Sequence, residues 1–106
     1  MANISLNVRD SEDKSKVAKT ITANGYDLMI GTVDDFMDIF DMNKIDDEKE
    51  VIKMVFKSYK QIKPLIMDIF KDLTEEDYRN VSVGDLVAVI PQIGLSIIEN
   101  IKQAKN

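Results

Sequence analysis

Carboxylates are the residues of this chain whose number and spacing could do chemistry. Residues 34–50 hold eight acids and two lysines, a local charge of 2 − 8 = −6. Such a cluster could hold a hard cation, or could place two carboxyl groups as acid and base. The calcium-loop pattern that starts at Asp41 fails, because Ile45, Asp46 and Ile52 stand where an oxygen ligand, the glycine and the bidentate glutamate belong.

The same acids alternate with apolar residues, as they do on the solvated face of an amphipathic helix. We therefore predict no metal site, no cofactor and no catalytic residue. An enzyme that uses carboxylates and Mg²⁺ at residues 34–47 is the alternative that the cluster leaves open.

The composition excludes most other chemistry. The 106 residues include no Cys, His or Trp, so histidine bases, thiolate nucleophiles and Cys or His metal sites are ruled out. A net charge of −5 argues against nucleic acids and anionic membranes as partners. The longest uncharged apolar stretch, residues 86–98, is shorter than the roughly 20 residues that span a bilayer. We predict a non-enzymatic single domain, residues 1–106, in a reducing cytoplasm.

The first 25 residues have the two-residue period of β-strands. Ile4, Leu6 and Val8 alternate with polar residues, and residues 17–23 repeat the alternation after a polar loop. Asn24 and Gly25 end the pattern. We predict a β-hairpin within residues 1–25, whose two strands need helices or a second subunit to be stable.

Residues 32–103 have helical periodicity and predict about four to five helices. Thr32 is a candidate cap for a first helix over 33–41, and Asp46 or Asp47 for a second one. Pro64 is expected to end or kink that second helix and to begin another over 64–71. The apolar stripe expected on the second helix is Ile52, Val55, Phe56, Tyr59 and Ile62.

Two further capping pairs precede the last elements. Thr74 with Asp77 predicts a short turn through Tyr78, and Ser82 with Asp85 predicts the start of a long final helix over 83–103. The predicted fold class is therefore α+β, mostly α.

The final helix is the most informative element. Its main stripe predicts a core face made by Leu86, Val87, Ile90, Ile93, Ile97, Ile98 and Ile101. Val89 and Leu95 lie outside this stripe on opposite flanks, which favours contact with a second protein; cover by other helices of the same chain is the alternative. We predict a partner or subunit surface that includes Val89, Ile93, Leu95 and Ile97. Gly94 permits close approach by another backbone.

Two segments resemble the tail assembly chaperones of long-tailed, siphovirus-type bacteriophages. Residues 65–77 read LIMDIFKDLTEED and residues 83–90 read VGDLVAVI. In that family a helix that ends in Phe is often followed by a Thr-initiated acidic turn and by an Asp-Leu start to a final apolar helix. The hairpin and the amphipathic helices before these segments fit the same order of elements.

The resemblance implies a small, acidic, self-associating protein in the cytoplasm of the infected bacterial host. It would bind the tape measure protein and keep it soluble, with the tail tube protein as a further partner, and would be absent from the finished virion. The family has no fixed active site, so no ligand residues are carried over. A different small helical interaction or regulatory protein, of phage or plasmid origin, is the alternative.

Overall fold

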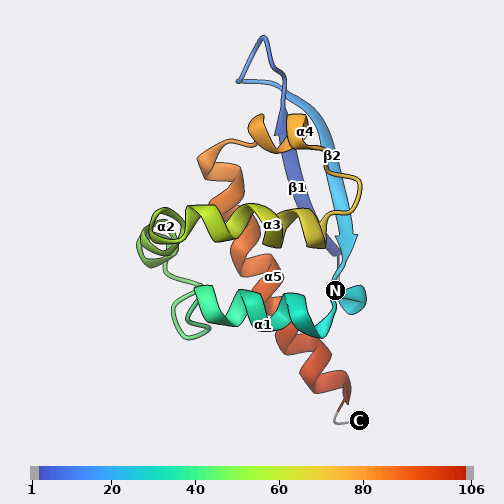
Figure 1. Ribbon diagram of the computed structural model, residues 1–106, viewed down its shortest axis with the longest axis vertical. Coiled ribbons are helices and arrows are strands. Elements are labelled where there is room, and N and C mark those ends of the chain that lie inside the picture. The colour runs from blue at the N-terminus through green and yellow to red at the C-terminus, as the bar shows by residue number, and fades with distance from the viewer. Residues whose placement is uncertain (1–2, 105–106) are drawn as a thin grey trace.

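The computed structural model describes residues 3–104 and has two strands followed by five α-helices (Figure 1). The elements are β1 (Asn3–Arg9), β2 (Val17–Asn24), the 3₁₀ turn η1 (Gly25–Asp27), α1 (Ile30–Ile39), α2 (Glu48–Lys57), α3 (Tyr59–Ile69), α4 (Glu75–Arg79) and α5 (Val83–Ala104). The predicted class, a mostly helical α+β fold with an amino-terminal hairpin and a long apolar last helix, is confirmed.

The hairpin pairs β1 and β2 in antiparallel register, with Leu6 opposite Ile21. Alternation buries Ile4, Leu6, Val8 and Ile21 on one face, while the other face carries polar residues such as Thr20. A register shift between Val8 and Arg9 adds a bulge at the loop end. The buried face is thus the side on which the helices pack.

The helix α5 runs along the molecule, and α1 and α3 cross it in the view of Figure 1. It packs against β1, η1 and α2, while α3 packs against α1 and α2. Buried phenylalanines fill the centre. The rings of Phe36 in α1 and of Phe40, which follows α1, are tilted by 35° with centroids 4.9 Å apart, and Phe70 follows α3.

The start of α5 is anchored to β1 by a two-pronged ion pair. The Arg9 guanidinium donates from Nε and Nη2 to the two carboxylate oxygens of Asp85, at 2.7 and 3.0 Å. Hydrogen bonds from Arg9 hold the pKa of the Asp85 carboxyl below its usual range, although burial opposes them. Ser82 Oγ accepts from the Asp85 N–H, so the predicted cap is confirmed.

Two predicted helix boundaries are wrong. α1 begins at Ile30, before the expected cap Thr32, whose side chain is buried instead. Between α2 and α3 the backbone turns at Ser58, and Pro64 lies inside α3. The turn at Ser58 lets α2 pack on α5 while α3 packs on α1, an arrangement set by tertiary contacts rather than by the proline.

The stripe expected on the second helix is also partly wrong. Val55 and Ile62 are buried, but Phe56 and Tyr59 are exposed, and Val51 takes the inner position instead. The N-cap of α2 is Asp47, which accepts hydrogen bonds from the backbone N–H groups of Lys49 and Glu50, as predicted.

By length and composition alone, the segment Val83–Ile101 could cross a bilayer, which the shorter uncharged stretch did not suggest. The apolar core helix of a soluble protein meets the same criterion. Here Val89, Ile90 and Ile93 are fully buried against the rest of the chain, and 39% of the apolar segment is buried in total, so intramolecular packing accounts for part of the apolar character of α5.

Candidate functional site: an apolar groove along the last helix

The structure separates the four residues predicted as a partner surface. Val89 and Ile93 are fully buried and Ile97 is almost so, whereas the Leu95 side chain is 54% exposed. Because α5 packs against β1 and η1 as well as against α2, its buried arc is wider than one stripe. Val89, Ile93 and Ile97 are therefore core residues, and the prediction of an accessible surface at these three positions needs correction; Leu95 remains available to a partner.

Leu95 lines a groove along the outer side of α5. Two adjoining hollows, of about 280 and 290 Å³, share Ile45, Asp46 and Pro91 in their walls. The α5 wall follows a row of side chains spaced three or four residues apart: Val83, Val87, Pro91, Leu95 and Ile98. Over this row the helix rises roughly 22 Å, about four turns.

The opposite wall comes from the loop before α2 and from the first turns of α2. Met42 and Ile45 supply the loop side, and Val51 and Ile52 supply the helix side. Turn hydrogen bonds fix this loop, since the Lys44 N–H donates to the Asp41 carbonyl at 2.8 Å. The groove is thus formed between a helix and a loop held by its own backbone.

Gly94 allows the loop to pack this closely. A Cβ at position 94 would overlap Cδ1 of Ile45, a buried side chain that lines both hollows. A close approach at Gly94 was expected from another backbone, but the group that approaches is the Ile45 side chain. The glycine therefore sets how deep the middle of the groove is.

The rim of the groove is acidic. Within residues 3–104, the side chains that line the two hollows include Asp46 and Glu48 and no lysine or arginine. An apolar trough with carboxylates at its rim suits a helix that has an apolar face flanked by basic residues.

A methionine-lined hollow continues from the loop side. Met37, Met42 and Met54 come together from α1, the loop and α2 around a volume of about 630 Å³, and Met42 also lines the groove. Met42 and Met54 are half-buried and also pack against the core, whereas Met37 is 50% exposed. Flexible methionines at a surface adapt to partners of varied shape.

The acidic cluster does not gather into a metal site. Across residues 3–104, no three acidic side chains converge as ligands of one ion. Asp47 instead caps α2, and Glu50 lies 3.3 Å from the Lys53 amine.

Comparisons of this chain with models of protein families, with curated proteins and with solved structures find no match. The groove along α5 is therefore the structural observation from which a function can be inferred.

Proposed function

We propose that this protein is a tail assembly chaperone that binds the tape measure protein and keeps it soluble during phage tail morphogenesis in the host cytoplasm. The single observation that supports this most is the apolar groove between α5 and the loop before α2. The resemblance of residues 65–77 and 83–90 to that family supplies the identity of the partner.

The groove fits a helical segment of the partner. A row of apolar side chains about four turns long matches the spacing of i, i+4 and i+7 anchors on an amphipathic helix. Burial of apolar surface contributes about 25 cal/mol per Å². A partner helix that buries only a few apolar side chains in the groove therefore gains a modest binding free energy. A chaperone needs such contacts to be reversible.

The methionine-lined hollow and the acidic rim extend this idea. Met37, Met42 and Met54 can repack around different side chains, which suits a partner with many related segments rather than one sequence. The carboxylates of Asp46 and Glu48 would attract segments with basic flanks. Self-association would add avidity along a long partner.

Co-expression tests the proposal. The tape measure protein from the same genome is produced in bacteria alone, with the wild-type chain and with the Leu95→Asp variant. We expect tape measure protein in the soluble fraction only with the wild type, because an aspartate in the groove places a charge against the apolar surface. Tape measure protein that stays insoluble with the wild-type chain would count against the proposal and favour a different interaction protein.

A further inference from the structure

The groove along α5 differs in charge between its two ends. Its amino-terminal hollow lies beside Val83, where α5 begins, and has both Asp46 and Glu48 in its walls. Its carboxy-terminal hollow lies beside Leu95 and shares Asp46, but no other charged residue of the described chain lines it. The negative charge of the groove is therefore concentrated at the end where α5 begins.

The two carboxylates have no cation of their own chain to pair with. Among the side chains that the structure describes, none forms an ion pair or a hydrogen bond with the carboxylate of Asp46 or Glu48, and both residues are exposed. The nearby amines of Lys44 and Lys53 lie 3.6 and 3.3 Å from Glu50 instead. A cation that enters this hollow would meet two unpaired charges and would not have to displace an existing pair.

The ends of two helices add to the polarity of the groove. α2 begins at Glu48 and α5 begins at Val83, so both amino-terminal ends lie at the amino-terminal hollow. The amino-terminal end of a helix carries a partial positive charge and the carboxyl-terminal end a partial negative charge, each about half an elementary charge. A helix bound in the groove is therefore favoured when its carboxyl-terminal end lies at this hollow.

Basic residues at that end of the bound helix satisfy both requirements. Lysine or arginine in the last turn stabilises a helix through its dipole. The same side chains would reach Asp46 and Glu48, while the backbone of the last turn lies near the start of α5. The charges of the groove thus select one charge pattern and one direction together.

We propose that the groove binds apolar helices whose basic residues are in the last turn, and that these helices run antiparallel to α5. The basic last turn lies over Asp46 and Glu48, and an uncharged first turn lies over Leu95. This inference rests on the proposed function, because it assigns the direction and the charge pattern of the tape measure segments that the groove holds.

The two ends of the groove are far enough apart for charge to set the direction. Val83 and Leu95 are 95 − 83 = 12 residues apart, which is roughly 18 Å along a helix. The Debye length at physiological ionic strength is about 8 Å, so a lysine beside Leu95 is largely screened from Glu48. A reversed helix would lose this ion pair and would place its partial positive end beside the start of α5.

Cysteine cross-linking tests the direction, because the chain has no cysteine of its own. Val83→Cys and Leu95→Cys place a thiol at either end of the groove, at side chains that are similarly exposed, 52% and 54%. The probe is a synthetic amphipathic peptide of about 18 residues, long enough to span the groove, with lysines in its last turn and a cysteine at one end.

The peptide with a carboxyl-terminal cysteine should form a disulfide with Val83→Cys and not with Leu95→Cys. An amino-terminal cysteine should give the opposite result. The two positions discriminate well, since a disulfide joins residues whose Cα atoms are only about 5.5 Å apart. Mass spectrometry after mild oxidation measures the yield of each adduct.

Neutral variants test whether the carboxylates are the cause. Asp46→Asn combined with Glu48→Gln removes both charges and keeps the size of the side chains. At low salt we expect this double variant to bind the labelled peptide about fivefold more weakly than the wild type, the effect of two exposed ion pairs. Fluorescence anisotropy measures the dissociation constant.

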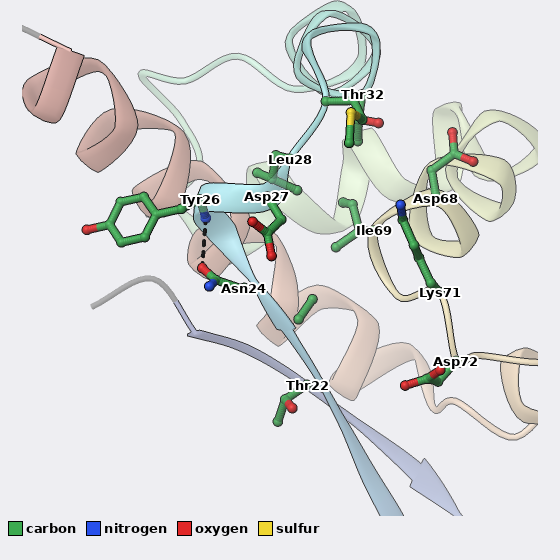
Figure 2. Close-up of a pocket in the computed structure, with 12 residues that line it drawn as sticks. Thr22, Asn24, Tyr26, Asp27, Leu28, Thr32, Asp68, Ile69, Lys71 and Asp72 are labelled. Carbon is green, nitrogen blue, oxygen red and sulfur yellow. Dashed lines mark hydrogen bonds between the residues drawn. The ribbon is translucent and has the colours of Figure 1, made fainter.

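A second acidic hollow supplies the matched control. This hollow of about 580 Å³ lies at the end of β2, and none of the residues that line it belongs to the groove (Figure 2). Figure 2 shows Asp68 and Asp72 on one wall, with Lys71 beside them. Asp68→Asn combined with Asp72→Asn changes the net charge by the same amount as the groove variant and should bind the peptide like the wild type.

Failure of this inference can be told apart from failure of the proposed function. A peptide that binds but cross-links equally at both cysteines, or in the opposite sense, would overturn the direction and leave the groove as the binding site. Unchanged affinity of the Asp46/Glu48 variant, or an equal loss in the Asp68/Asp72 control, would overturn the role of the carboxylates. A peptide that does not bind the wild-type chain at all would contradict both the inference and the proposed function.

Discussion

Replacement of Gly94 by alanine tests the packing that shapes the groove. In a helix interior this change stabilises by about 1 kcal/mol through propensity. The new methyl group would overlap Cδ1 of the buried Ile45, however, so that side chain must swing toward the groove. Exposure of one methyl group costs about 0.8 kcal/mol and an off-rotamer side chain about 1 kcal/mol. The net expectation is a loss of about 1 kcal/mol.

The effect of Gly94→Ala on the free energy of unfolding should change from a loss to a gain once the clash with Ile45 is removed. Ile45→Val deletes Cδ1, at a cost of about 1 kcal/mol in an otherwise unchanged chain. In that background the alanine methyl group enters vacated space, while the other nearby atoms, Ile45 Cγ1 and Met42 Cε, lie at 3.6 and 3.7 Å, ordinary contact distances. Gly94→Ala should then stabilise by about 1 kcal/mol, a coupling of about 2 kcal/mol between the two sites.

Urea unfolding of the wild type, both single variants and the double variant measures this coupling. All four are followed by circular dichroism at one protein concentration, so that any self-association affects them equally. Equal m-values confirm that the variants unfold from comparable native states. An alanine at position 94 that stabilises by the same amount with isoleucine and with valine at position 45 would refute the packing described for the loop.

Two further predictions concern the anchors of α4 and α5. The pKa of the Asp85 carboxyl is lowered chiefly by hydrogen bonds from Arg9; for Asp77, burial would raise the pKa, but hydrogen bonds from Lys19 and Thr74 lower it overall. A lowered carboxyl pKa stabilises the fold above the unfolded value near 4, and this contribution is lost as the pH falls through the folded value. Asp85→Asn should therefore be less stable than the wild type at pH 7 and should lose less unfolding free energy between pH 5 and pH 2; equal slopes in urea titrations would contradict this. Thr74→Ala breaks the capping box with Asp77 and should lower stability by about 1 kcal/mol, whereas Thr74→Ser should not; equal urea midpoints for the two would show that the cap is unimportant.

Local signals in the sequence predict much of this fold. The alternation of Ile4, Leu6 and Val8 gives the hairpin, and the side chains of Thr74 and Ser82 cap the helices that they were expected to cap. These features depend on neighbours within a few residues. They can therefore be deduced without knowledge of the tertiary structure.

Features that depend on packing between elements were missed. The turn at Ser58 has no proline or glycine signal and follows from the separate partners of α2 and α3. Val89 was placed outside the core stripe because a single stripe was assumed, whereas α5 is covered on more than one side. The methionine-lined hollow joins Met37, Met42 and Met54 from three segments, and no spacing along the chain reveals such a cluster.

Of the groove, the sequence predicts only that Leu95 is available to a partner, and Leu95 is exposed and lines it. The opposite wall depends on the loop that packs Ile45 against Gly94. A glycine in the middle of an apolar helix was the signal for that contact. The identity of the contacting residue could not be deduced, because the loop and α5 are about 50 residues apart in the sequence.

The affinity of the tape measure protein for two matched variants tests the central claim most directly. Leu95 lies in the groove and Phe56 lies outside it, and their side chains are similarly exposed, at 54% and 59%. Purified Leu95→Asp and Phe56→Asp are titrated against a fluorescently labelled apolar helical segment of the tape measure protein. The proposed function predicts at least about tenfold weaker binding for Leu95→Asp, the equivalent of about 1.4 kcal/mol, and wild-type binding for Phe56→Asp. Wild-type affinity for Leu95→Asp, or equal losses for both variants, would contradict the assignment of the groove as the binding site.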